Sequence, residues 1–242
     1  MPIMFLHYTA DGFLVILPQD VPRRIVDAML GTGYSKEFCI AFNFDPDFVA
    51  RLMEAGFLVM SSRLADPEDA GTPEAGERFI LLPKLHLSRS VLFFDKLHIK
   101  NSIKRHLSRF ELCFDADCER IIDRCVEIHG DDWLTAPLVA AFRNIRRDRL
   151  YGVYPASFAL YRNGKLVAGE FGVIAGRVYT SYSGYYDENN AGTVQLILTA
   201  HYLQKHGYAF FDLGMPLDYK TDLGATDVSP REFITLFRSA QH

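Results

Sequence analysis

The pair Asn163-Gly164 lies between two long apolar segments, residues 156–161 and 165–174. Because Asn and Gly both adopt the positive φ of a tight turn, this pattern predicts two antiparallel strands joined by a two-residue loop. A third apolar segment, residues 177–182, follows at once and is expected to pair with the second strand. The chain is therefore expected to contain an antiparallel meander.

The chain after this meander is predicted to form a helix and then a buried strand. Residues 193–205 are amphipathic, and Gly207 is placed to end the helix. The next apolar segment, residues 208–212, ends on an acid, Asp212. Helices beside a largely antiparallel sheet indicate an α+β fold. Upstream, the pattern predicts strands over 79–82 and 90–94, and helices over 101–110, 116–129 and 137–149.

The N-terminal part has its own pattern of strands and helices. Strands are expected over 13–17 and 38–42, and helices over 21–30 and 45–56, the last beginning at an Asp and ending at a Gly. Residues 63–77 contain two prolines, two glycines and five acids, which is typical of a surface loop or linker. We therefore expect a small N-terminal α/β domain over 1–62, a linker over 63–77 and a larger domain over 78–242.

Charge, hydropathy and cysteine spacing narrow the class of protein. The net charge is −4, which argues against a protein that coats nucleic acid through a uniformly basic surface. The sequence has no run of eighteen apolar residues and no basic leader, so we expect a cytoplasmic protein without a membrane partner. The four cysteines form no C-x-x-C pair and the histidines show no ligand spacing, so reduced thiols and no metal are expected.

Basic residues gather in two places despite the acidic balance. Both groups could contact the phosphates of an RNA without reading its sequence, and each could equally be a solvated helix face. The first group, with no acid between residues 96 and 110, is Lys96, Lys100, Lys104, Arg105 and Arg109, and the second is Arg143, Arg146, Arg147 and Arg149.

Four segments together form a more specific pattern. They are residues 94–105, Asp132-Trp-Leu-Thr-Ala-Pro137, the hairpin residues 164–173, and the C-terminal set Phe211-Asp212, Asp218, Leu223-Gly-Ala225 and Pro230-Arg-Glu-Phe233. This set resembles the motifs of the leucyl/phenylalanyl-tRNA–protein transferases over residues of about 79–240. The resemblance implies that residues 78–242 form a GNAT-like acyltransferase domain, with a mainly antiparallel sheet and flanking helices.

The resemblance also implies a reaction. An aminoacyl group would pass from charged tRNA to the N-terminal α-amine of a protein or peptide, marking it for degradation by the N-degron pathway. No cofactor is needed, because the aminoacyl ester is already activated and positioning, a proton acceptor and an oxyanion donor suffice. Three alternatives stay open: an acyl-CoA-dependent N-acyltransferase, a Fem-like peptidoglycan aminoacyltransferase, and a non-enzymatic protein that binds tRNA or peptide.

Three positions differ from the family pattern. Tyr182 and Gly184 stand where the family has Glu and Met, and Gly214 stands where it has Gln. The tyrosines of this segment, with Asp187-Glu188 directly after them, could favour a basic aminoacyl donor over leucyl or phenylalanyl, although these acids also have ordinary turn composition.

Candidate site residues follow from the resemblance and from side-chain chemistry. A strand-end carboxylate could orient the amine and remove its proton, or it could simply cap a loop. A tyrosine hydroxyl could donate to the oxyanion and its ring could stack on adenine, although alternating Tyr and Ser is also ordinary sheet surface. The sole Trp could line a pocket or fill the core. We predict catalytic roles for Asp212 and Tyr182, substrate binding by Trp133, Ser183, Tyr185, Tyr186 and Gly214, and tRNA binding by Lys100, Lys104, Arg105 and Arg109.

Overall fold

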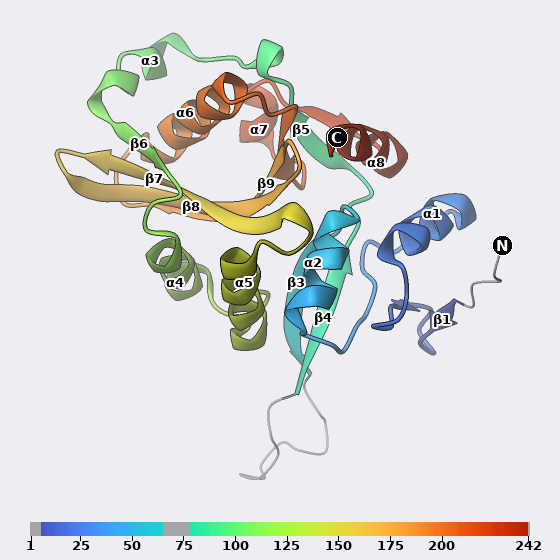
Figure 1. Cartoon of the computed structure of the whole chain (residues 1–242). Coiled ribbons are helices and arrows are strands. Elements are labelled where there is room, and N and C mark those ends of the chain that lie inside the picture. Colours follow the sequence, from blue (N-terminus) through green and yellow to red (C-terminus); the bar gives the residue numbers. More distant parts are fainter. Residues whose placement is uncertain (1–5, 65–77, 242) are drawn as a thin grey trace.

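A seven-stranded sheet forms the centre of the computed structural model, which describes residues 6–64 and 78–241 (Figure 1). The parallel pair β9–β10 is flanked on both sides by antiparallel pairs. This mixed, mainly antiparallel arrangement confirms the α+β prediction. In spatial order the strands are β11 (Thr226–Val228), β5 (Arg89–Leu92), β10 (Phe210–Gly214), β9 (Val178–Tyr186), β8 (Lys165–Ala175), β7 (Val153–Arg162) and β6 (Glu111–Phe114).

The hairpin predicted from Asn163-Gly164 is confirmed. Both residues have positive φ, 50° and 76°, and Arg162 pairs with Lys165 across the turn. From there β7 and β8 pair along nearly their whole length, and β9 adds to β8 as the third strand of the meander. The signal was reliable because a two-residue loop of this kind fixes both the turn and the strand register.

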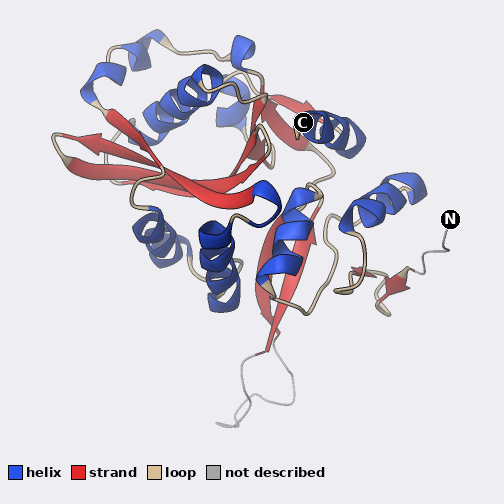
Figure 2. Ribbon diagram, viewed as in Figure 1, coloured by secondary structure: helices blue, strands red, loops and turns tan. Residues whose placement is uncertain are grey.

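Helices cover the two faces of the sheet (Figures 1 and 2). The helix α6 (Ala191–Lys205) crosses one face, while α4 (Cys118–His129) and α5 (Ala136–Asp148) pack on the other. These three correspond to predicted helices. Two further helices follow β10 in the chain, α7 (Asp218–Asp222) and α8 (Pro230–Ser239).

The predicted continuous helix over 101–110 is wrong. The segment contains only a short helix α3 (Asn101–Lys104) and a 3-10 turn η2 (Leu107–Arg109), preceded by another 3-10 turn η1 (Phe94–Lys96). The chain here curves over α6 on its way to β6 (Figure 1), with Ile103 and Leu107 packed inward. A straight helix of that length would not follow this curve, so the segment is folded from short turns.

The N-terminal part lies beside the sheet, at the end where β9 and β10 meet α8. Its helix α2 begins as predicted, with the Asp45 carboxylate accepting a hydrogen bond from the main-chain N of Asp47 at 2.9 Å. The strand expected over 13–17 is only two residues long, and residues 38–42 make only isolated bridges. The elements are β1 (His7–Tyr8), β2 (Leu14–Val15), α1 (Pro22–Thr32), α2 (Pro46–Glu54), β3 (Leu58–Leu64) and β4 (Arg78–Lys84).

The expected linker over 63–77 lies mostly outside the described residues. Its first two residues, Arg63 and Leu64, belong to β3. The strands on either side of it pair with each other from Leu58↔Lys84 to Leu64↔Arg78. The division of the chain into two domains stays a prediction, but the first strand after the expected boundary pairs with the last strand before it.

Within residues 6–64 and 78–241, no helix combines the length and the apolar character of a membrane-spanning segment.

Candidate functional site

The strands β9 and β10 pair only briefly before they separate. Their parallel pairing runs from Val178 to Thr180 on β9, whereas β9 itself continues to Tyr186. At the point of separation each strand has a bulge: the register with the antiparallel neighbour skips Tyr182 on β9 and Leu213 on β10. Bulges bend and twist a strand and re-aim its side chains, so this is the part of the sheet where a site can be built.

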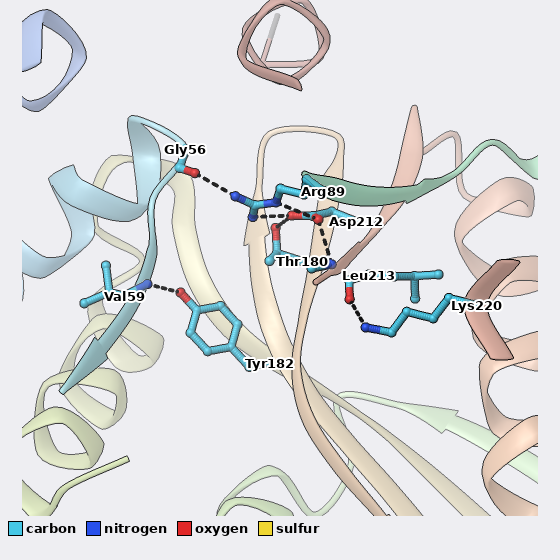
Figure 3. A network of polar contacts seen from close by, with 9 residues as sticks. Gly56, Val59, Arg89, Thr180, Tyr182, Asp212, Leu213 and Lys220 are labelled. Carbon is cyan, nitrogen blue, oxygen red and sulfur yellow. Dashed lines mark hydrogen bonds and ion pairs between the residues drawn. The ribbon is translucent and has the colours of Figure 1, made fainter. Parts of the chain in front are cut away.

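A buried ion pair lies in the middle of β10, where its pairing with β9 ends (Figure 3). The Asp212 carboxylate is fully buried, and Arg89 of β5 donates to both of its oxygens, at 2.9 Å from Nε and 2.5 Å from Nη2. The Thr180 hydroxyl and the main-chain N of Gly214 donate the other two hydrogen bonds, at 2.7 and 3.1 Å. Each carboxylate oxygen therefore accepts two hydrogen bonds, which is the usual full complement of an ionised carboxylate.

Arg89 joins this pair to the N-terminal part of the chain. Its Nη1 donates to the Gly56 carbonyl oxygen at 3.1 Å, and its guanidinium lies 3.8 Å from the ring centroid of Phe233 on α8. Gly56, with φ of +103°, comes so close to α8 that an added Cβ would lie 2.7 Å from Ile234 Cδ1. The ion pair thus connects β5, β10, α8 and the end of α2.

Tyr182 contacts the N-terminal part as well. Its hydroxyl accepts a hydrogen bond from the main-chain N of Val59 on β3 at 3.0 Å (Figure 3), and its ring packs edge-on against Phe142 of α5. Burial raises the pKa of this hydroxyl. The hydroxyl faces the joint between β9 and β3, so the predicted catalytic tyrosine connects two parts of the structure.

Trp133 lies on the same side of the sheet as Tyr182. Its ring stacks on Phe171 with centroids 6.4 Å apart, and its carbonyl oxygen accepts a hydrogen bond from the main-chain N of Ser61 at 2.9 Å. It packs against the core cluster that includes α5, so of its two possible roles the core position is the one seen.

A cavity of about 550 Å³ lies on the α6 side, between the end of β9, the start of α6 and α7. Of the predicted site residues, Tyr185 and Tyr186 line it. Asp212, Tyr182, Trp133, Ser183 and Gly214 are not among its lining residues. The structure therefore divides the predicted site between the two sides of the sheet. The lining residues are Glu170, Ser181, Gly184, Tyr185, Tyr186, Asn189, Asn190, Gly192, Thr193, Gln195, Leu196 and Tyr219.

Glu170 is the residue of this cavity that the sequence reasoning missed. It is buried on β8, and burial raises the pKa of its carboxyl group to about 7. The available signal was one ionisable residue inside the otherwise apolar segment 166–174. Such a residue is costly in a buried strand unless it is paired or functional.

Lys220 fixes α7 to the end of β10 and was also missed. Its buried ammonium donates to the carbonyl oxygens of Leu213 at 2.5 Å and Met215 at 2.8 Å, and burial lowers its pKa. Tyr219, the residue before it, lines the cavity. Lys220 therefore sets the position of one cavity wall.

The first basic group borders the same hollowed face. A second cavity of about 240 Å³ is lined by Lys100 and shares Thr193, Leu196 and Tyr219 with the first. Lys100 also forms an exposed ion pair with Asp222 at 2.6 Å. Of the other basic residues of the group, Lys96 lies in η1, and Lys104, Arg105 and Arg109 follow along α3 and η2.

The Leu-Gly-Ala motif attaches this basic segment to the rest of the domain. The Leu223 carbonyl oxygen accepts a hydrogen bond from the main-chain N of His98 at 2.8 Å. At Gly224, with φ of +99°, an added Cβ would lie 2.0 Å from the carbonyl oxygen of Lys96, so only glycine fits. Close packing against the basic segment therefore explains why this motif has glycine at its centre.

The second basic group lies on the opposite face, so the interpretation that both groups face one RNA is wrong. Its first three arginines belong to α5, where Arg143 pairs with Glu119 at 2.5 Å and Asp123 at 3.0 Å, and Arg147 pairs with Asp148 at 2.7 Å. Arg149 directly follows α5 and lies over the ring of Tyr154.

The described part of the chain contains no group of three or more His, Cys, Asp or Glu side chains placed to hold a metal ion. All four cysteines are free thiols, and burial raises the pKa of Cys39 and Cys125 to about 12. These two thiols are thereby kept protonated and unreactive at neutral pH.

Comparison with known proteins places this fold and these motifs in a family. The model of the leucyl/phenylalanyl-tRNA protein transferase family matches residues 91–238. The chain belongs to this family.

Individual relatives are divergent. The leucyl/phenylalanyl-tRNA–protein transferase of Pseudomonas putida (strain W619) is 29% identical over 150 residues, a match that covers 60% of this chain and 65% of the relative. That of Syntrophobacter fumaroxidans (strain DSM 10017 / MPOB) is 31% identical over 154 residues, covering 61% and 64%. The match thus spans less than two thirds of the length of these relatives.

Solved structures are similar at a lower level. FemX has a TM-score of 0.47 and 9% identity, with 93% of this chain and 81% of that chain covered. The structure of L-PGS from Bacillus licheniformis has a TM-score of 0.42 and 12% identity, with 98% and 89% covered.

Proposed function

We propose that this protein is an aminoacyltransferase that moves an amino acid from charged tRNA to the N-terminal α-amine of an acceptor protein. Its family membership over residues 91–238 supports the reaction type. The structural observation that carries the proposal is the arrangement of one hollowed face, where the cavity beside Glu170 adjoins the basic segment at Lys100. A negatively charged polymer whose end carries the reacting ester fits such a face.

The tRNA would approach along the basic segment. Lys100, Lys104, Arg105 and Arg109 would contact phosphates, which position an RNA without reading its sequence. Tyr186 is 66% exposed at the cavity and could stack on the terminal adenine. The aminoacyl group at the 3′ end would then enter the cavity.

The chemistry needs positioning more than covalent catalysis. The amine attacks an ester that is already activated, so no cofactor is required. We assign the larger part of the chain to a GNAT-like acyltransferase domain, which lies beside a small N-terminal α/β domain. The assignment is supported by the short parallel pair β9–β10, which lies between antiparallel strands and whose two strands then separate. Charged tRNA is a cytoplasmic substrate, so the cytoplasm is the expected compartment, and the N-degron pathway the expected use of the product.

The roles of the predicted residues change with their surroundings. We assign Asp212 a positioning role, because all four of its acceptor sites are filled by protein donors. Tyr182 joins β9 to β3 through its hydroxyl, and Trp133 supports the same joint. Ser183 and Gly214 would shape the two bulges, and Tyr186 remains a candidate for direct substrate contact. The ring of Tyr185 is buried on the α4 side, with the Arg124 guanidinium 5.9 Å from its centroid, so its predicted substrate contact has no support there.

The donor is expected to be leucyl or phenylalanyl. The two acids that could attract a basic aminoacyl group each form an ion pair with an arginine. Asp187 lies 3.5 Å from Arg124, and Glu188 lies 2.7 Å from Arg162. These acids are therefore partly neutralised.

One reaction tests the proposal. The protein is incubated with a mixture of charged tRNAs and a peptide whose N-terminus is either free or acetylated, and the products are read by mass spectrometry. The free peptide should gain one amino-acid mass, mainly leucine or phenylalanine, and the acetylated peptide should gain none. Equal labelling of the acetylated peptide, or labelling only when acyl-CoA replaces tRNA, would reject the proposed function.

A further inference from the structure

We propose that Glu170 is the group that accepts the proton of the attacking amine. The inference rests on the proposed function and names the catalytic carboxylate of that site. Among residues 6–64 and 78–241, Glu170 and Asp212 are the two buried carboxylates. Asp212 is saturated by protein donors, so Glu170 is the one with capacity left for a substrate.

The Glu170 carboxylate is buried but incompletely bonded. The residue is only 4% exposed, and its Oε1 atom has no hydrogen-bond partner within the described part of the chain. Buried polar atoms are nearly always paired, and Glu170 lines the cavity, so this unpaired oxygen leaves the carboxylate able to accept a further donor. A donor such as an amine would complete it.

Glycine at position 184 leaves room beside this carboxylate. Gly184 lies directly across from Glu170 in the β8–β9 register and also lines the cavity. An added Cβ there would lie 3.3 Å from Glu170 Cβ and 3.0 Å from the Gly169 carbonyl oxygen. A side chain at position 184 would therefore crowd the carboxylate that the cavity exposes.

Several groups from neighbouring elements act on Glu170. The hydroxyls of Ser181 and Tyr179 on β9 and the ammonium of Lys220 on α7 favour its ionised form. Burial raises the pKa of Tyr219 on α7 and of Cys125 on α4, and the negative charge of Glu170 raises both a little further. Burial outweighs the favourable groups, and the carboxyl therefore titrates at about pH 7. General bases are most effective when they titrate near the working pH.

The proposed step balances. The amine nitrogen forms a bond to the ester carbonyl carbon, and the bond from that carbon to the ribose oxygen breaks. The proton lost by the nitrogen passes to the Glu170 carboxylate and is then delivered to the departing ribose oxygen. The products are a peptide bond and uncharged tRNA, with Glu170 again ionised.

The test compares Glu170→Gln with wild type across pH 6 to 9 under the assay described above. Glu111→Gln is the matched control, because it makes the same chemical change at an exposed position of β6 in the same sheet. We expect Glu170→Gln to lose about 100-fold or more in kcat/KM at pH 7, the usual range for a general base. The loss should persist above the amine pKa of about 7.7–8.0, because the neutral amine must still give up an N–H proton as it attacks the ester.

The outcomes separate the inference from the proposed function. Active wild type with a folded Glu170→Gln variant of equal rate from pH 6 to 9 overturns the inference alone, and so does a variant that only changes which charged tRNA is used. Absence of transfer by wild type overturns both. Should Glu170→Gln fail to fold, Glu170→Asp serves instead: it keeps the charge and retracts it by one methylene, and an unchanged rate and pH profile would contradict the inference.

Discussion

Removing Arg89 should destabilise the protein more than removing any exposed arginine. Arg89→Met keeps the length of the side chain and deletes two hydrogen bonds to Asp212 and one to Gly56. Asp212 would be left fully buried, with only the Thr180 hydroxyl and the Gly214 N–H as donors. Breaking a buried ion pair from one side costs about 3–5 kcal/mol, a large part of the ~5–15 kcal/mol that stabilises a typical domain.

Urea unfolding measures this loss as a lower midpoint at unchanged slope. Arg143→Met is the matched control, because Arg143 also bonds two carboxylates but is 47% exposed, and exposed pairs contribute about 0–1 kcal/mol. The double variant Arg89→Met, Asp212→Leu should be less unstable than Arg89→Met, since it leaves no buried charge. A loss below about 1 kcal/mol for Arg89→Met would refute the reasoning and indicate that Asp212 is neutral or solvated in the protein.

Three other outcomes are expected. Tyr182→Phe leaves a main-chain N–H of β3 without its acceptor and should cost about 1–3 kcal/mol in urea unfolding; no change would mean that water replaces the hydroxyl. Replacing Lys104, Arg105 and Arg109 by Ala should lower the slope of log K for tRNA against log salt by roughly one per lost phosphate contact, and an unchanged slope would exclude them from the interface. Because the pKa of Glu170 is raised by folding from 4.5 to about 7, its ionisation destabilises the folded state: wild type should lose stability relative to Glu170→Gln between those pH values, by about 3 kcal/mol, and parallel pH curves would contradict this.

Features determined by neighbouring residues were predictable from the sequence. The Asn163-Gly164 turn and the Asp45 cap each depend on side chains and backbone within a few positions, and both are confirmed. The segment 101–110 was misassigned because its shape depends on α6, which lies far along the chain. Its apolar residues have helical spacing, but the segment packs over α6 along a curved path and therefore forms short turns in place of one helix.

The candidate site was less predictable, because its key contacts are long-range. Arg89 and Asp212 are 123 positions apart, and nothing local in the sequence pairs them. The sequence placed Asp212 at the end of a strand, but β10 runs from Phe210 to Gly214 and Asp212 lies in its middle, and its neighbours decide what it can do. Glu170 lay in a segment whose pattern predicted only a buried strand, and its charge was the signal of an additional role.

The two buried carboxylates lie on opposite sides of the sheet and have different roles, one structural and one proposed to be catalytic. Asp212 accepts four hydrogen bonds and has a cationic partner, so its charge is held in place and its oxygens are occupied. Glu170 lines a cavity, has one unpaired oxygen and has a pKa that burial raises to about 7, so it can gain and lose a proton at neutral pH. Asp212 therefore holds β9 and β10 in place at the point where they separate, whereas Glu170 can take part in a reaction. The side chain that is least satisfied by the protein is therefore the one most available to a substrate.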